Sequence, residues 1–257
     1  MFKKLLASAG IGNATVEAVM LSPTLQAGEP FELEVTIQGG EVAQEVQGLA
    51  FAIMTGAHAQ THDGKHEFVK NVVLQEWWQE LNITVQAGET LTKTFTLTLH
   101  TEIPATELMG EQIANVWLQT GLDIKYGLDG SDQEPLVILP RATQLAVLKC
   151  LNQSGYRLFK SDIEVGRAQT PDFISHLPCY QEYEFKPESR SWLGIQEIEA
   201  TFVDNDNETG LLLEVDRAFQ SDGYRSVSIP NHCTTVAEVK PYIQQILGRS
   251  SRARACA

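Results

Sequence analysis

Three histidines spaced four residues apart form the first candidate site for chemistry: His58, His62 and His66. On a helix, histidines at positions i and i+4 share one face and can bind the same metal ion. The pair Asp63-Gly64 between them is typical of a hairpin turn, although a hairpin could still bring His62 and His66 together. We interpret the segment as an exposed polar loop, with a metal site as the alternative.

The run from Asp204 to Gly210 places oxygen-bearing side chains at alternating positions, as a calcium-binding loop does. An EF-hand loop needs its glycine at the sixth position and a bidentate glutamate at the twelfth. Here Gly210 is seventh, Val215 stands twelfth, and predicted strands flank the run. A hairpin turn is the preferred interpretation, and a loose cation site is the alternative.

Nucleophilic and cofactor chemistry find no support in the sequence. The cysteines form no C-x-x-C pair, so neither a zinc site nor a disulfide framework is indicated, and we expect free thiols: Cys150, Cys179, Cys233 and Cys256. A G-x-S-x-G motif is absent from the sequence. The glycines of Gly10-Ile11-Gly12 precede a predicted strand, whereas a dinucleotide-binding loop follows one. We predict a protein that is not an enzyme and binds no cofactor.

Two adjacent tryptophans, Trp77 and Trp78, would point to opposite faces of a strand. One of them is expected in the core. The other could be an exposed aromatic contact for a partner protein or a sugar ring, and simple packing at a sheet edge is the alternative.

The chain has 257 residues and a formal net charge of −14. Residues 1–139 contain 18 acidic residues, 6 lysines and no arginine. This charge disfavours nucleic acid and anionic lipid as partners and suits a basic protein surface. The apolar stretch near Met1 is too short for a signal peptide, and none approaches the length of a membrane span. We therefore expect a cytoplasmic protein without integral membrane association.

Apolar and polar residues alternate through the first half, as in the run from Phe31 to Gln38. About seven such runs separated by turn signals predict an antiparallel β-sandwich over residues 1–139. The polar run Asp129–Pro135, followed by Leu136–Pro140, is typical of an interdomain connector. A hinge is a hypothesis for this connector, with salt bridges setting the angle between the domains, and solvated surface charge is the preferred alternative. The candidate hinge residues are Asp132, Glu134, Pro135, Pro140 and Arg141.

The second half, residues 140–249, begins with a predicted helix over 141–152 and ends with another over 235–247, in which Thr235 and Glu238 form a capping box. Pro241 lies deep enough in the second helix to favour a kink. Five strands are predicted between the helices: 156–165, 181–185, 195–203, 211–216 and 224–229. A short amphipathic helix is expected before Gly10, and residues 250–257 are expected to form a flexible tail.

Several segments together resemble one known family. They are Phe2–Gly12, Thr94–Leu99 with Pro104, Val116–Ile124 with the following acidic residues and Val137–Pro140, and Leu177–Pro187. The chain is similar, in this order, to the SpoOM family of bacterial sporulation-control proteins. The resemblance implies a mainly β fold of two arrestin-like antiparallel β-sandwich domains with a few short helices, and it brings no catalytic residues.

The function expected from this resemblance is that of a regulatory adaptor, which acts through protein–protein contacts of an arrestin-like scaffold. Exposed strand edges and loops could bind a partner protein, with a homodimer as an open alternative. A second hypothesis is a β-sandwich ligand-binding module for a carbohydrate or a divalent cation, which would use the Trp77/Trp78 region or the histidine loop. An enzyme is the third and least supported hypothesis, because no nucleophile, acid–base pair or cofactor loop has a suitable context.

Overall fold

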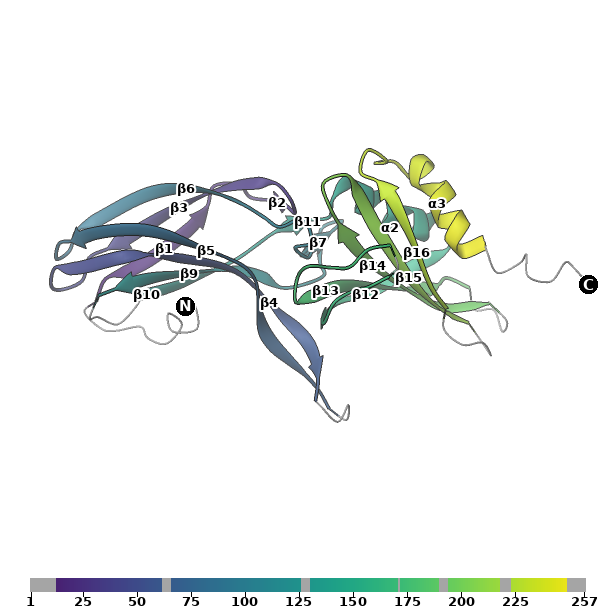
Figure 1. Cartoon of the computed structure of the whole chain (residues 1–257), viewed down its shortest axis with the longest axis horizontal. Coiled ribbons are helices and arrows are strands. Elements are labelled where there is room, and N and C mark those ends of the chain that lie inside the picture. The colour runs from purple at the N-terminus through teal and green to yellow at the C-terminus, as the bar shows by residue number, and fades with distance from the viewer. Residues whose placement is uncertain are drawn as a thin grey trace, which may run out of the picture. The chain divides into compact units, whose positions relative to one another are not determined.

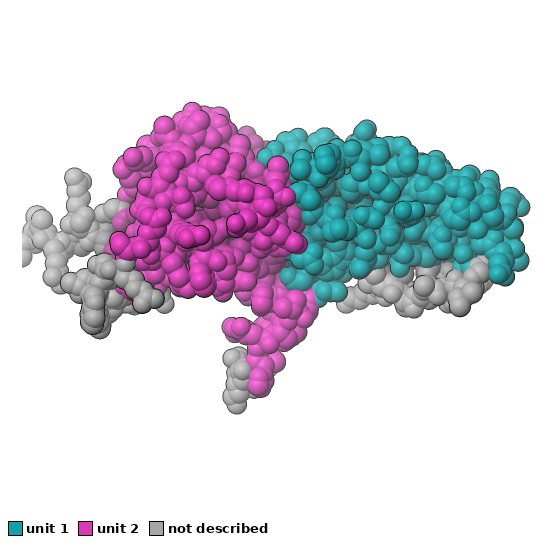
Figure 2. Space-filling model, turned by 180° about the vertical axis from the view of Figure 1, so that it is seen from behind, with its two compact units in different colours: residues 1–56, 71–100, 115–138 teal, residues 57–70, 101–114, 139–257 magenta. Residues whose placement is uncertain are grey.

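The computed structural model describes residues 13–61, 66–125, 130–170, 172–189, 194–217 and 223–248. The chain forms two compact units that are interleaved in sequence (Figure 2). Unit 1 comprises residues 1–56, 71–100 and 115–138, and unit 2 comprises residues 57–70, 101–114 and 139–257. The predicted division at residue 139 coincides with the last passage of the chain between the units, but two earlier segments also belong to unit 2. That residues 1–139 and 140–249 form independent domains stays a prediction.

Unit 1 contains two antiparallel sheets (Figure 1). The first has the order β1-β3-β6, with β1 at Thr15–Met20, β3 at Pro30–Gln38 and β6 at Thr90–Thr98. The second has the order β10-β9-β4-β5, with β10 at Gly130–Pro135, β9 at Val116–Ile124, β4 at Gln44–Gln60 and β5 at Glu67–Val85. The short strand β2 (Leu25–Gln26) pairs with β11 (Ile138–Leu139). The last residues of β4 and the first residues of β5 belong to unit 2.

Period-two alternation explains why these segments form a sandwich. Phe31, Leu33, Val35 and Ile37 of β3 are buried while the glutamates between them are exposed. The rings of Phe51 in β4 and Phe95 in β6 lie 5.4 Å apart, so the two sheets bury their apolar faces against each other.

The prediction of a polar loop over Asp129–Pro135 is wrong for Gly130–Pro135, which form strand β10 and pair with β9. Asp132 Oδ2 accepts a hydrogen bond of 2.9 Å from the N–H of Ala18, and this bond links β10 to β1. An edge strand tolerates charge and proline because one of its sides does not need a full ladder of hydrogen bonds. Gly130–Pro135 therefore form a strand although their composition is typical of a loop.

Unit 2 contains five antiparallel strands in sequential order, and the first of them also pairs in parallel with the end of β4 at His58. Its strands are β12 (Tyr156–Val165), β13 (Cys179–Pro187), β14 (Ile195–Asp204), β15 (Glu208–Arg217) and β16 (Gly223–Pro230). A small hairpin joins β7 (Glu107–Leu108) to β8 (Glu111–Gln112). The two described helices are α2 (Ala142–Gln153) and α3 (Val236–Gly248). The five predicted strands and both predicted helices are confirmed, whereas the predicted N-terminal helix and the tail lie outside the described residues.

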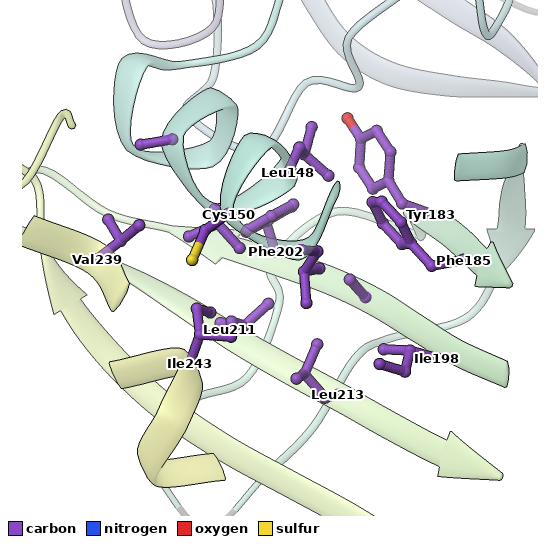
Figure 3. Close-up of a cluster of buried hydrophobic side chains, with 14 of the residues drawn as sticks. Leu148, Cys150, Tyr183, Phe185, Ile198, Phe202, Leu211, Leu213, Val239 and Ile243 are labelled. Carbon is purple, nitrogen blue, oxygen red and sulfur yellow. The ribbon is translucent and has the colours of Figure 1, made fainter. Parts of the chain in front are cut away.

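Both helices cover one face of this sheet (Figure 1). Leu148 of α2 and Ile243 of α3 point toward the inward side chains of the strands, such as Phe185, Ile198 and Leu213 (Figure 3). The predicted capping box begins α3, because Thr235 Oγ1 accepts the N–H of Glu238 and the Glu238 carboxylate accepts the N–H of Thr235. The helices thus supply the second layer over the sheet, and neither described helix lies on the opposite sheet face.

Candidate functional site: an acidic sheet face

The face of the unit 2 sheet that points away from α2 and α3 carries a dense array of carboxylates. Alternation produces it, because inward Tyr183, Ile198 and Leu213 lie between outward acidic residues. We define the acidic face by Asp162 and Glu164 in β12, Glu182 and Glu184 in β13, Glu197 and Glu199 in β14, and Glu214 and Asp216 in β15.

The strand register places these carboxylates directly beside one another. Glu184 lies opposite Glu199, and Glu199 lies opposite Glu214. Residues directly opposite on antiparallel strands have Cβ atoms about 5 Å apart, and like charges there are destabilising. The arrangement therefore costs stability in unit 2.

Two lysines compensate one side of the acidic face. Lys160 Nζ lies 2.8 Å from Asp162 and 3.1 Å from Glu184. Lys186 Nζ lies 2.8 Å from Glu184 and 3.6 Å from Glu197. Burial alone would raise the pKa of Glu184, but the hydrogen bonds from Lys186 and Lys160 outweigh it, and this pKa lies below its ordinary value.

Glu182 and Glu199 differ from Glu184, because their pKa values are raised. Burial, followed by repulsion from Glu199, Glu164 and Glu214, raises the pKa of Glu182 to about 7. Burial, followed by repulsion from Glu214, Glu197 and Glu184, raises the pKa of Glu199 to about 7. Both side chains therefore change their protonation near neutral pH, and a nearby cation would favour their charged forms.

These carboxylates line a hollow of about 200 Å³. Glu182, Glu199 and Glu214 contribute to it, together with Tyr180 and Tyr224. Tyr224 is 68% exposed. Burial, with repulsion from Glu182, raises the pKa of Tyr180 to about 12, so it stays a neutral hydroxyl. The hollow combines three carboxylates and two aromatic rings, a chemistry that suits an organic cation, and Arg167 also lines it.

The segment after β12 bounds the hollow and is held in place by Glu102. The nearly buried Glu102 carboxylate accepts hydrogen bonds from the backbone N–H of His176 (2.8 Å) and of Leu177 (3.2 Å). Phe173 of the same segment packs on Gly210, where an added Cβ would lie 2.8 Å from the Phe173 ring. These contacts hold the segment after β12 in place at one end of the acidic face.

Of the candidate histidines from the sequence, His58 lies near the acidic face. His58 Nε2 is 3.8 Å from Asp162 Oδ1, and His58 lies opposite Glu164 in the strand register. His66 is exposed, and His62 lies outside the described residues. Among the residues that the structure describes, no three potential ligands are close enough to hold a metal ion.

The two tryptophans belong to unit 1. The Trp77 ring lies edge-on to buried Phe31, with centroids 6.3 Å apart. Trp78 is 44% exposed and covers Gly48, where an added Cβ would lie 2.5 Å from the indole ring. A partner contact by Trp78 stays a prediction.

The predicted hinge residues separate into two groups. Asp132, Glu134 and Pro135 belong to β10 of unit 1, where burial and repulsion from Asp132 raise the pKa of Glu134. Pro140 and Arg141 belong to unit 2, and Arg141 forms the N-cap of α2 and donates a hydrogen bond of 3.2 Å to the carbonyl of Asn205. Their role in a hinge stays a prediction.

The run from Asp204 to Gly210 forms a hairpin turn, as expected. Asn205 Oδ1 accepts the N–H groups of Asn207 and Glu208, each at 2.9 Å, and so closes the turn. The Asp204 carboxylate is buried and accepts a hydrogen bond from the Gln144 amide. Burial raises the pKa of Asp204 to about 6, and this carboxylate points into the protein instead of toward a loop cation.

The described cysteines are free and buried, as expected for Cys150, Cys179 and Cys233. Burial raises the pKa of Cys150, and it raises the pKa of Cys179 to about 12. Thiols with such pKa values are almost fully protonated at neutral pH and are poor nucleophiles.

The acidic face itself was not predicted from the sequence, although a signal was present. Acidic residues occur at alternate positions in four predicted strands: Asp162-x-Glu164, Glu182-x-Glu184, Glu197-x-Glu199 and Glu214-x-Asp216. Alternation places each pair on a single face, so a comparison of strand faces would have found it.

Comparisons of sequence and of structure with known proteins identify the same family. The model of the family described as SpoOM protein matches residues 2–219. The sporulation-control protein Spo0M of Bacillus subtilis (strain 168) is 31% identical over 217 residues, which cover 84% of this chain and 80% of that protein. The crystal structure of Spo0M from Bacillus subtilis matches with a TM-score of 0.78 and 25% identity, covering 93% of this chain and 99% of that chain.

A CARDB domain of Pyrococcus furiosus, crystallised with di-metal ions, matches with a TM-score of only 0.28 and 12% identity. The mainly β, arrestin-like sandwich fold that was predicted is confirmed by the Spo0M structure. The family relatives are named for sporulation control and not for a catalysed reaction. Within the described residues, neither helix has the length and apolar character needed to cross a membrane.

Proposed function

Because this chain belongs to the SpoOM family of sporulation-control proteins, we propose that it is a regulatory protein without catalytic activity that binds a partner protein through the acidic face. The observation that carries this proposal is a sheet face that neither of the described helices covers, on which carboxylates outnumber the lysines that pair with them. Unit 2 retains this face although it costs stability, and such a cost is typical of functional surfaces.

The partner surface that fits the acidic face is rich in arginine and lysine. A guanidinium group can bind a carboxylate through two parallel hydrogen bonds and can also stack on Tyr180 or Tyr224. Its charge would lower the raised pKa values of Glu182 and Glu199. Binding near pH 7 should therefore release protons and weaken as salt concentration rises.

The absence of catalysis and a cytoplasmic location are part of the same proposal. The described thiols are free and buried, burial raises the pKa of Cys150 and of Cys179, and free thiols suit a reducing compartment. The proposed protein needs no cofactor, because its action depends on association alone.

A capture experiment with charge-neutral variants tests this function. The immobilised protein is exposed to lysate of its own cells in three forms: wild type, Glu182→Gln/Glu199→Gln/Glu214→Gln, and a control triple variant. The control, Glu32→Gln/Glu34→Gln/Glu111→Gln, removes the same charge from exposed positions outside the acidic face. Glutamine keeps the side-chain shape, so a difference between the triple variants reports position and not net charge.

We expect wild type and the control to recover the same protein, and the acidic-face variant to recover at least about tenfold less. Calorimetry of the recovered pair at pH 7 in two buffers of different ionisation enthalpy should show proton release. Equal recovery by all three forms would contradict the proposal. A thermal stabilisation by Ca²⁺ or Mg²⁺ that the acidic-face variant loses, without any recovered protein, would favour a cation-binding module instead.

A further inference from the structure

A small polar cavity lies inside unit 2, where residues 101–105 pack on the sheet. Thr101 Oγ1 donates a hydrogen bond of 2.8 Å to the backbone carbonyl of Asp204 in β14. Gln181 of β13 accepts the N–H of Ala105 and donates to its carbonyl, each at 2.9 Å. The cavity has a volume of about 20 Å³, and Ala105, Gln181, Tyr183 and Asp204 are among the residues that line it. Several hydrogen-bonding groups therefore meet at this cavity.

One oxygen of Asp204 lacks a hydrogen-bond partner. The Asp204 side chain is buried, with the residue only 2% exposed. Its Oδ2 accepts a hydrogen bond from Gln144 Nε2, and Gln144 also lines the cavity. Its Oδ1 is buried and has no partner among the described residues. A buried acceptor without a partner costs about 1–3 kcal/mol, and more when it is charged, so the native state would gain from a donor at Oδ1.

Two side chains beside Asp204 in the cavity already donate elsewhere. The Tyr183 hydroxyl donates its one hydrogen to Gln181 Oε1 at 2.9 Å. Gln181 Nε2 donates one hydrogen to the carbonyl of Ala105 and the other to Ser161 Oγ at 3.0 Å. Neither side chain can therefore donate to Asp204 Oδ1 without breaking a bond that it now makes.

The Thr209 hydroxyl is a third nearby donor that is already used. It lies close enough to lower the pKa of Asp204, but its one hydrogen is donated to Asn231 Oδ1 at 2.9 Å. Asn231 is held in place, because its Nδ2 donates to the carbonyl of Asn205 at 2.9 Å. A small molecule in the cavity can supply the donor that these side chains do not.

A single water molecule fits the cavity in size and in chemistry. A buried water needs about 10–15 Å³ and about two to four polar partners, and the cavity has about 20 Å³. Water brings one hydrogen for Asp204 Oδ1 and another for a second acceptor. The Tyr183 hydroxyl oxygen can be that acceptor, because an oxygen that donates its hydrogen still has lone pairs. Molecules with several heavy atoms exceed this volume.

We propose that the cavity binds one water molecule, which donates hydrogen bonds to Asp204 Oδ1 and to the Tyr183 hydroxyl oxygen. The water connects β14 with β13 beside residues 101–105, because Tyr183 donates to the same Gln181 side chain that holds Ala105. A hydrogen bond to the charged carboxylate favours that form, so the water offsets part of the cost of burying Asp204. The water site is independent of the function proposed for the acidic face.

A crystal structure of the protein at pH 7.5 tests the site directly. We expect a density peak in the cavity at about 2.5–3.0 Å from Asp204 Oδ1, the range of an O–H···O hydrogen bond. A well-defined map without a peak at this oxygen would overturn the proposal. Crystals grown with rubidium chloride in place of sodium chloride distinguish water from a monovalent cation, because only rubidium gives an anomalous signal. An anomalous peak in the cavity would assign the site to a cation and also refute the proposal.

Oxygen-17 relaxation dispersion of water tests the same site in solution, because it counts waters that stay bound for longer than the protein takes to tumble. The variant Asp204→Leu/Gln144→Leu replaces both members of a hydrogen-bonded pair by apolar side chains of similar size. Asp204→Asn is the matched control, because an amide still offers a hydrogen-bonding group to the cavity. Circular dichroism verifies that each variant is folded.

We expect the double leucine variant to contain about one long-lived water fewer than wild type, and Asp204→Asn to contain the same number as wild type. An equal count in wild type and in the folded leucine variant would contradict the proposal. If the leucine variant does not fold, the density at Asp204 Oδ1 in the wild-type crystal still decides the question.

Discussion

Replacing Glu199 by glutamine should stabilise the protein at alkaline pH and leave its stability unchanged at acidic pH. Burial and the neighbouring carboxylates raise the pKa of Glu199 from 4.5 to about 7. In the unfolded chain the pKa returns to its ordinary value, so the native state binds an extra proton between these two values. The native state is therefore penalised progressively as pH rises from about 4.5 through about 7. Above that range the penalty is complete.

The size of the effect follows from the shift in pKa. A difference of about 2.5 units corresponds to about 3.4 kcal/mol for a fully buried group. Glu199 is only partly buried, and water screens repulsion at such a position, so we expect a gain of about 1 kcal/mol in the free energy of unfolding at pH 8. This gain corresponds to a rise of about 2–4 °C in the midpoint of the unfolding transition of unit 2.

Thermal unfolding by calorimetry at pH 5 and pH 8 measures this gain. Glu111→Gln is the matched control, because Glu111 is an exposed glutamate of unit 2 outside the acidic face. The reasoning is refuted if Glu199→Gln gives the same change at both pH values, or if Glu111→Gln gives an equal gain at pH 8. A stabilised Glu199→Gln protein that binds its partner less well would show that the acidic face is retained for function.

Three further substitutions test individual contacts. Asp204→Asn should raise the unfolding midpoint at pH 7.5 but not at pH 4, because burial raises the pKa of Asp204 to about 6 and the charged form is penalised only at higher pH. Glu102→Ala should cost about 1.5–3 kcal/mol by removing a charged acceptor, and hydrogen exchange should accelerate at the His176 amide that it accepts. Gly210→Val should lower the free energy of unfolding in urea by about 1–3 kcal/mol, because its Cβ would meet the Phe173 ring at 2.8 Å. Adding Phe173→Ala should recover part of this loss. If nothing is recovered, another contact is responsible.

Much of the secondary structure could be predicted because the core imposes a clear period. The alternation from Phe31 to Gln38 predicted β3, and the apolar spacing of Leu145, Leu148 and Leu151 predicted α2. The pair Thr235 and Glu238 predicted where α3 begins. In each case one face of the element must be buried, and this requirement produces a periodic pattern within a short stretch of sequence.

The strand β10 and the acidic face escaped prediction for a different reason. Residues 140–257 are almost neutral in sum, because their acidic and basic residues nearly balance. In the folded unit 2, Arg141 and Arg225 lie elsewhere. Glu182, Glu199 and Glu214 gather at one hollow, where Arg167 is the basic residue among the lining side chains. Pairing between distant strands creates that concentration, and no local period reveals the partner of a strand.

The interleaving of the two units has a consequence for how the protein is made. Gln181 of unit 2 exchanges two hydrogen bonds of 2.9 Å with the backbone of Ala105, which is 76 residues earlier in the chain. At a synthesis rate of about 5–20 residues per second, Ala105 waits about 4–15 s for this partner to be made. Residues 115–138 of unit 1 are completed during that interval. Unit 1 can therefore finish folding on the ribosome while the early segments of unit 2 still lack their sheet, and a chain that stops at residue 139 would carry those segments without anything to bury them.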